Sequence, residues 1–271
     1  MRVGFFAFLC SLLVTDFAMA APKAELWDYW LTHDPKSTQS VDHTAWDRFL
    51  KTYVVKGNNG VNLVNYGGVS KADRQALNSY IQQLSKTAVA RLNRVEQRAL
   101  WINLYNALTL QVILDHYPVA SIRDIDISPG LFASGPWGKK LLRIDGEEVS
   151  LDDIEHRILR PIWQDPRVHY AVNCASIGCP NLQPEAFTAE NTERLLDKGA
   201  REYINHPRGV RIDGGELNVS SIYNWFEADF GGNDQGVIAH LKRYAEPELS
   251  KQLDAFRDIG DDSYDWSLNG S

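Results

Sequence analysis

The chain has 271 residues and a formal net charge of −7 at pH 7. This acidic balance argues against binding to a nucleic-acid backbone or to an anionic membrane surface. The hydrophobic fraction of 44% is enough to fill a buried core, so the composition indicates a soluble globular protein.

The first twenty residues have the pattern of a secretory signal peptide. Arg2 precedes an apolar stretch over residues 5–14, and the small residues Ala18 and Ala20 follow it. Because this stretch is too short to cross a bilayer, the pattern favours cleavage after Ala20 over a retained anchor. We therefore expect residues 21–271 to form one exported domain, periplasmic or secreted, without stable membrane insertion.

Capping residues and hydrophobic spacing predict helices in the first half of the mature chain. A serine and an asparagine, each followed three residues later by an acid, predict helices over about 70–85 and 93–116. Pro118 ends the second helix, because proline disfavours helical geometry in the residue before it. Before these helices, aromatic and aliphatic residues recur at helical spacing between positions 26 and 53.

The second half of the chain mixes short strands with short helices. Residues 141–151 read as a β-hairpin about Asp145-Gly146, a dipeptide suited to a type I′ turn, and 209–219 read as another. Residues 169–173 read as an internal strand, and helices are expected over about 220–230 and 235–244. The order predicts an α+β fold: a helix-rich single domain with a small, mainly antiparallel sheet and β-hairpins.

Polar residues interrupt the apolar stripe of the longest predicted helix. Glu96 and Asn103 fall on one stripe, where they would face a pocket and orient a histidine or a substrate amide. Glu96 also stands at the capping-box position of this helix, which is a structural alternative. Asn103 and Asn106 lie among apolar neighbours, so they either tie the helix to a loop or serve a site.

The segment HYAVNCASIGCPNL, residues 169–182, holds a histidine and two cysteines. One interpretation is a nucleophilic Cys174 with His169 as its base and Glu96 or Asn103 as the group that fixes the histidine tautomer. This interpretation predicts a thiol-dependent hydrolase or an acyl-transfer enzyme that acts on amide or ester bonds. The strand alternation places His169 and Asn173 on one face, and the turn after Cys174 can bring the thiol back to it.

A disulfide between Cys174 and Cys179 is the competing interpretation. Both cysteines survive signal cleavage, five positions apart, in a compartment that permits disulfides, and Ser176 and Gly178 turn the chain between them. A zinc site with His169 and these cysteines, with or without His156, is a third alternative, although the spacing lacks the close cysteine pair of structural zinc sites. Helical spacing points His156 away from the apolar stripe of Leu151, Ile154 and Ile158, so a solvated histidine is expected there. We expect no metal, and no cofactor motif such as a phosphate-binding loop or dinucleotide fingerprint is present.

Several long motifs stand in a fixed order along the chain. They are LWINLYNALTL at 100–110, SLDDIEHRILRP at 150–161, HYAVNCASIGCPNL at 169–182, SSIYNWFEADF at 220–230 and SYDWSLN at 263–269. Together they resemble the DUF547 family from about residue 70 to the C-terminus. The resemblance implies a core over about 70–232 with a C-terminal helical extension and tail to 271, and it implies no established activity. The positions that sit in its motifs are Glu96, Asn103, Tyr105, Asn106, His169, Cys174, Ser176, Cys179, Pro180 and Asp229.

Two classes of function follow from these observations. The first is the thiol enzyme with Cys174, His169, Glu96 and Asn103 as catalytic residues. The second is a non-catalytic binding or scaffold module that uses the same pocket and has the structural disulfide. In both, the expected partner is a small molecule or a peptide, and the expected binding residues are Tyr105, Asn106, Asn173, Ser176 and Asp229. Asp229 stands near a helix end that its charge opposes, so it needs a specific partner.

Overall fold

The computed structural model describes residues 22–130 and 134–271. The expected signal peptide, residues 1–20, lies outside the described residues. Over the two described ranges, none of the helices combines the length and the apolar character needed to cross a membrane.

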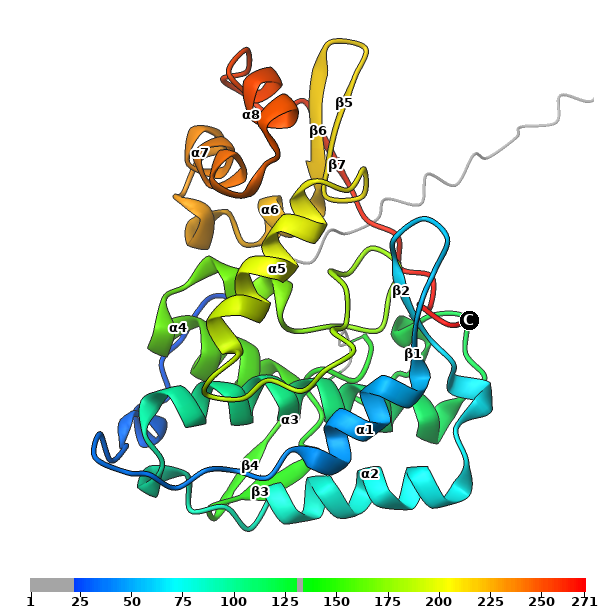
Figure 1. The fold of residues 1–271 in the computed structure, drawn as a ribbon, viewed down its shortest axis with the longest axis vertical. Helices are drawn as coiled ribbons and strands as arrows, with labels where there is room; N and C mark the ends of the chain where they lie inside the picture. The colour runs from blue at the N-terminus through cyan, green and yellow to red at the C-terminus, as the bar shows by residue number, and fades with distance from the viewer. Residues whose placement is uncertain (1–21, 131–133) are drawn as a thin grey trace, which may run out of the picture.

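Helices form most of the fold, and the strands form small sheets (Figure 1). The α-helices are α1 (Thr44–Tyr53), α2 (Lys71–Leu84), α3 (Arg94–His116), α4 (Arg160–Trp163), α5 (Thr192–Ile204), α6 (Ser221–Trp225), α7 (Asp234–Tyr244) and α8 (Pro247–Leu253). The 3₁₀ turns are η1 (Asp28–Leu31), η2 (Tyr66–Gly68), η3 (Val89–Arg91), η4 (Ile122–Asp124), η6 (Pro166–Tyr170) and η7 (Glu227–Phe230), and η5 (Asp153–Leu159) is a π-helix. The helix-rich α+β fold expected from the sequence is confirmed.

Three separate small sheets contain the strands. They are β1 (Val54–Lys56) with β2 (Asn62–Val64), β3 (Leu142–Ile144) with β4 (Glu147–Val149), and β5 (Val210–Asp213) with β6 (Glu216–Ser220) and β7 (Asp261–Ser263). All pairs are antiparallel except β6 with β7, which is parallel. The predicted type I′ turn is confirmed, because Asp145 and Gly146 both have positive φ, 49° and 90°.

Helix α3 is the centre of the larger hydrophobic core. Nearly every residue from Glu96 to Leu114 is buried, because α2, α5 and η5 pack around the helix and leave it no solvent face. Its N-terminus is where the sequence places it: the Asn93 side chain accepts hydrogen bonds from the backbone N–H groups of Val95 and Glu96. The predicted boundaries of α2 and α3 are confirmed.

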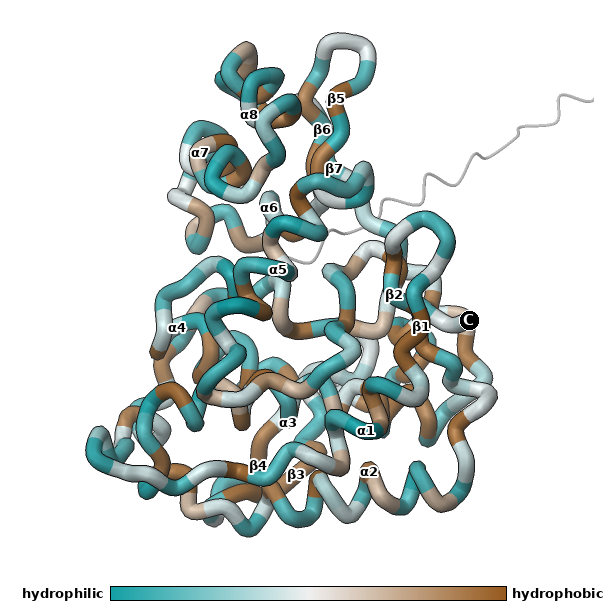
Figure 2. Tube along the Cα trace, viewed as in Figure 1, coloured by the Kyte–Doolittle hydropathy of each residue, from teal (hydrophilic) through white to brown (hydrophobic). Residues whose placement is uncertain are grey.

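A second, smaller hydrophobic cluster lies among α5, α7, α8 and the β5–β6–β7 sheet, at the top of Figure 1. Figure 2 shows that α8 is mainly hydrophilic, whereas β1 and β2 carry hydrophobic stretches. After β7 the chain returns to the larger core and ends beside β2, where Gly270 bridges to Val64 (Figure 1). The last residues of the chain therefore join the two hydrophobic clusters.

The strand predicted over residues 169–173 is wrong. This segment contains the end of the 3₁₀ turn η6, followed by a loop. Pro166 fits the first position of a helical turn, and the Asp165 side chain caps the turn by accepting from the N–H of Arg167. A short apolar run that is buried on all sides has no alternation to distinguish a strand from a turn, which explains the error.

Candidate functional site

The loop that carries the two cysteines is held against α3 by an asparagine side chain. The Asn106 amide donates to the carbonyl of Ala171 at 2.9 Å, and its oxygen accepts from the N–H of Asn173 at 2.8 Å. The Asn173 side chain in turn donates to the carbonyl of Pro180 at 2.8 Å and closes the loop. Asn106 thus provides the donor and the acceptor that a neighbouring strand would provide.

Cys174 and Cys179 are free thiols whose sulfur atoms lie 2.6 Å apart. A disulfide has an S–S distance of about 2.05 Å, so the disulfide expected from the sequence is wrong. The loop closes through hydrogen bonds instead. Besides the contact between the two thiols, Cys179 Sγ accepts from the backbone N–H of Cys174 at 2.9 Å.

Two hydroxyl groups complete the surroundings of the Cys174 sulfur. Ser176 Oγ lies 3.1 Å from Cys174 Sγ, and the Tyr264 hydroxyl lies 3.0 Å from the same atom. The two hydroxyls are 2.9 Å apart, so they form a connected network. We call Cys174, Ser176, Cys179 and Tyr264 the thiol cluster.

The thiol cluster favours one negative charge and opposes a second. Burial alone would raise the pKa of Cys179, but hydrogen bonds from the Cys174 thiol, the Tyr264 hydroxyl and the Cys174 N–H lower it to about 7. Burial and the neighbouring Cys179 raise the pKa of Cys174 well above its ordinary value. The two thiols therefore share at most one negative charge near neutral pH, and Cys179 is the sulfur that ionises first.

Backbone strain occurs directly after the first cysteine. Ala175 has φ = 58°, in the left-handed region that a residue with a Cβ rarely adopts. Such strain costs on the order of 1–2 kcal/mol and is concentrated at functional sites in proteins. Here it turns the chain so that the Ser176 hydroxyl and the Cys179 sulfur both return to Cys174.

A second group of polar side chains surrounds His169. Asp229 Oδ2 accepts from Arg160 Nε at 2.6 Å and lies 2.8 Å from His169 Nε2, and Glu155 Oε1 lies 3.6 Å from His169 Nδ1. We call Glu155, Arg160, His169 and Asp229 the ion cluster. Both ring nitrogens of His169 face carboxylates, and among the described residues its hydrogen bonds do not reach Cys174. The structure therefore does not pair the two residues that the sequence suggested as nucleophile and base.

The π-helix η5 brings Glu155 and Arg160 together. In an α-helix, residues five apart point about 140° away from each other, whereas a π-helix bonds each residue to the one five positions on and superposes them. The N–H of Arg160 donates to the carbonyl of Glu155 in this way. The same change of phase buries His156, which helical spacing had predicted to be solvated. That prediction is wrong.

The ion cluster is buried and its charges are compensated. The side chains of His169 and Arg160 are 1% and 4% exposed, and that of Asp229 is 21% exposed. Although burial opposes it, the charges and hydrogen bonds of His156, His169 and Arg160 lower the pKa of Glu155 to about 2. His169 and Arg160 also hold the pKa of Asp229 well below its usual range, against the opposing effect of burial. Asp229 thus has the specific partners that its position required.

The remaining predicted site residues of α3 have separate partners. Asn103 exchanges two hydrogen bonds with the backbone of Phe187, at 2.7 and 3.0 Å, and so ties the helix to a loop. Glu96 Oε2 accepts from the N–H of Val41 at 3.3 Å. Tyr105 is buried; burial raises its pKa most, and the charges of Glu155 and Cys174 add to the effect.

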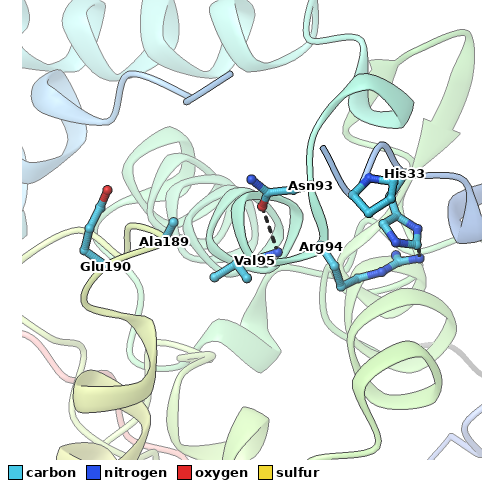
Figure 3. A pocket seen from close by; sticks show the side chains of 7 residues that line it. His33, Asn93, Arg94, Val95, Ala189 and Glu190 are labelled. Carbon is cyan, nitrogen blue, oxygen red and sulfur yellow. Dashed lines mark hydrogen bonds between the residues drawn. The ribbon is translucent and has the colours of Figure 1, made fainter. Parts of the chain in front are cut away.

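A hollow with a volume of about 530 Å³ lies at the N-terminus of α3. Figure 3 shows Asn93 at its centre between Glu190 and His33, with Arg94 beside the histidine. None of the predicted site residues lines this hollow. Among the described residues, we also find no group of three His, Cys, Asp or Glu side chains arranged to hold a metal ion.

The segment that contains most of this site matches a known family model. The family model described as "Protein of unknown function, DUF547" matches residues 89–204. The match makes residues 89–204 a DUF547 segment of the chain. No curated protein and no solved structure matches the chain significantly. The segment that matches DUF547 contains Cys174, Cys179 and the loop between them, and also Glu155, Arg160 and His169, whereas Asp229 and Tyr264 lie beyond it.

Sequence reasoning missed Glu155, Arg160 and Tyr264. Glu155 and Arg160 stand in the motif SLDDIEHRILRP, but only the π-helix places them on one face, and no local pattern predicts a π-helix. Tyr264 belongs to the motif SYDWSLN. The motif itself was the signal that could have identified Tyr264, because its aromatic residues stand in a tail whose sequence shows no periodicity of a buried helix or strand.

The free thiols can be counted directly. When a chain of residues 21–271 is denatured without reductant, iodoacetamide is expected to modify both Cys174 and Cys179, since neither sulfur is in a covalent bond. Intact-mass analysis measures the number of adducts. A protein that takes up adducts only after reduction would contradict the structure.

Proposed function

We propose that this protein is a thiol-dependent hydrolase or acyl-transfer enzyme in which Cys174 Sγ is the nucleophile. The observation that supports the proposal is the contact of this half-buried sulfur with a second thiol whose pKa is about 7. Thiolates, not thiols, attack electrophilic carbon, so a cluster in which one sulfur ionises near neutral pH fits this chemistry.

In this proposal Cys179 is the proton acceptor. Cys179, as the thiolate, takes the proton of the Cys174 thiol while Cys174 Sγ bonds to the acyl carbon of an ester or amide. The bond from that carbon to the leaving group breaks, and the leaving group takes the proton from Cys179. Water or another nucleophile then attacks the thioester, which releases the acyl group and restores the thiol.

We assign proton acceptance to Cys179 instead of His169 for a geometric reason. The hydrogen bonds of His169 are directed to the ion cluster, whereas Cys179 Sγ is in contact with the sulfur that must lose its proton. The role that we propose for His169 is to hold Asp229 and the segment that carries it. Asn106 and Asn173 then position the loop, as their hydrogen bonds to the backbone indicate.

The test is the formation of a thioester on Cys174. With an activated aryl ester of a short acyl chain, we expect an acyl adduct on Cys174 that mass spectrometry can locate. Cys174→Ser is expected to abolish the adduct, and Cys179→Ser to slow its formation by about 10²-fold or more, the typical effect of removing a positioned base. Equal acylation of wild-type protein and the Cys174→Ser variant would contradict the proposal. If no acylation occurs, the remaining functional interpretation is a non-catalytic binding module.

We also propose that the protein is exported, on the strength of the pattern in its first twenty residues. The expected mature N-terminus is Ala21. Mass analysis of the protein recovered from the periplasm or the medium of an expression host measures it. A full-length chain that remains in the cytoplasm would contradict export.

A further inference from the structure

The last residues of the chain lie along the loop that carries Cys174 and Cys179. The N–H groups of Ile177 and Gly178 donate to the carbonyls of Ser267 and Asp265, both at 2.8 Å, and the N–H of Asn269 donates to the carbonyl of Ala175 at 3.1 Å. We call residues 264–270 the C-terminal strap. These backbone bonds cover the segment between the two cysteines.

The strap is also fixed on its other side. The N–H of Leu268 donates to the carbonyl of Ala120 at 2.8 Å, and the N–H of Val64 donates to the carbonyl of Asn269 at 2.8 Å. The buried Tyr66 hydroxyl donates to Asn269 Oδ1 at 2.7 Å. The strap is therefore held by the larger core on both sides, so its position relative to the thiols is well defined.

Two features of this contact place Tyr264 at the sulfur. Gly178 leaves no room for a side chain, since a Cβ there would lie 2.8 Å from the backbone nitrogen of Asp265. The Tyr264 ring packs against Trp225 and Trp266, with ring centroids 4.9 and 4.6 Å apart. With its backbone and its ring both fixed, the hydroxyl is aimed at Cys174 Sγ at 3.0 Å.

We infer that Tyr264 is a positioning residue of the thiol site: its hydroxyl donates a hydrogen bond to Cys174 Sγ and stabilises the thiolate that forms there. The C-terminal strap, which lies outside the segment matched by the family, thus completes the site. This inference rests on the proposed function for its catalytic meaning. Its central statement, stabilisation of a thiolate, can be measured without any substrate.

The electrostatics of the cluster explain why a donor is needed there. When Cys174 passes its proton to Cys179, negative charge moves to a sulfur that burial disfavours as an anion. Hydrogen bonds to a charged acceptor are about twice as strong as those to a neutral one. The Tyr264 hydroxyl therefore contributes more to the charged state than to the thiol, and so it promotes ionisation.

The test is the pH dependence of the alkylation of Cys174 by iodoacetamide, followed by peptide mass mapping. Tyr264→Phe keeps the ring packing and removes only the hydroxyl. We expect the midpoint of the rate profile to rise by about one pH unit, which corresponds to the free energy of one hydrogen bond to a charged group. The rate near neutral pH is then expected to fall about tenfold and to converge with wild type at high pH.

Tyr66→Phe is the matched control. It removes a buried hydroxyl that holds the same strap but donates to Asn269 instead of sulfur. We expect this variant to melt at a lower temperature and to keep the wild-type midpoint. If both variants shift the midpoint equally, or if Tyr264→Phe leaves it unchanged, the inference is overturned.

A second substitution keeps the inference testable if Tyr264→Phe folds poorly. Incorporation of 3,5-difluorotyrosine at position 264 retains the hydroxyl and makes it a stronger donor, so the midpoint is expected to fall; a midpoint that rises or stays would overturn the inference. If the midpoint shifts as expected but Cys174 is not acylated, the role of Tyr264 is supported and the proposed function is refuted.

Discussion

Asp229→Ala is expected to lower the free energy of unfolding by about 3–5 kcal/mol, the cost of removing one partner from a buried ion pair. Asp229 Oδ2 is the shared acceptor of Arg160 Nε and His169 Nε2, at 2.6 and 2.8 Å. The substitution leaves the guanidinium, only 4% exposed, without its nearest carboxylate. Urea denaturation followed by circular dichroism measures the change.

A surface ion pair provides the matched control. Arg74 and Asp115 pair with side chains that are 42% and 47% exposed. Since solvated pairs contribute at most about 1 kcal/mol, Asp115→Ala is expected to change stability little. If the two alanine variants lost equal stability, the ion cluster would be solvated and its charges would not be buried.

Local signals in the sequence correctly predicted most of the regular structure. Helices α2 and α3 begin at side-chain caps, Ser70 and Asn93, and the caps act within four residues of the chain. The β3–β4 hairpin follows from Asp145-Gly146, because the turn conformation depends on these two residues alone. In each case the determinant and the structure are neighbours in sequence.

The errors occur where a distant side chain decides the local structure. Residues 169–173 do not form a strand, because Asn106, over sixty positions away, satisfies the backbone groups of Ala171 and Asn173. From the sequence, the asparagines of α3 either tie the helix to a loop or serve a site. Only the structure shows that Asn103 does the first, by binding the backbone of Phe187. Tertiary contacts of this kind leave no local signature.

The candidate site was predictable as a segment but not as a set of partners. The sequence indicated residues 169–182 as the candidate segment, because this stretch holds a histidine and two cysteines. It suggested that His169 serves Cys174, but the π-helix η5 supplies His169 with Glu155 and Arg160 as neighbours instead. The residue that does reach the sulfur, Tyr264, comes from ninety positions further along the chain.

Acidification from pH 7 to pH 4.5 is expected to destabilise the protein by several kcal/mol, because three buried histidines are held neutral. Burial, the largest cause in each case, lowers the pKa values of His43, His156 and His240 to about 4. In the unfolded chain a histidine takes up its proton near pH 6.5. The unfolded state therefore binds more protons throughout the interval from 6.5 to 4.

The direction of the stability change and the pH range in which it occurs follow from this difference in proton binding. Stability is complete above pH 6.5, where histidines are neutral in both states, and it is lost progressively as the pH falls toward 4. With three protons taken up on unfolding, the slope reaches roughly 4 kcal/mol per pH unit at its steepest. Asp152 acts in the opposite direction, since burial raises its pKa to about 6, but its side chain is 40% exposed and its effect is smaller.

Two substitutions test this account through opposite changes of slope. His43→Gln retains a polar group beside the Tyr80 hydroxyl, which lies 2.6 Å from His43 Nδ1, and removes one titrating group. It is expected to reduce the slope by about 1.4 kcal/mol per pH unit, the weight of one proton. Asp152→Asn removes an opposing group and is expected to make the slope steeper. Urea denaturation at pH 7, 6, 5 and 4.5 measures both, and a slope that neither substitution changes would show that other groups control the acid sensitivity.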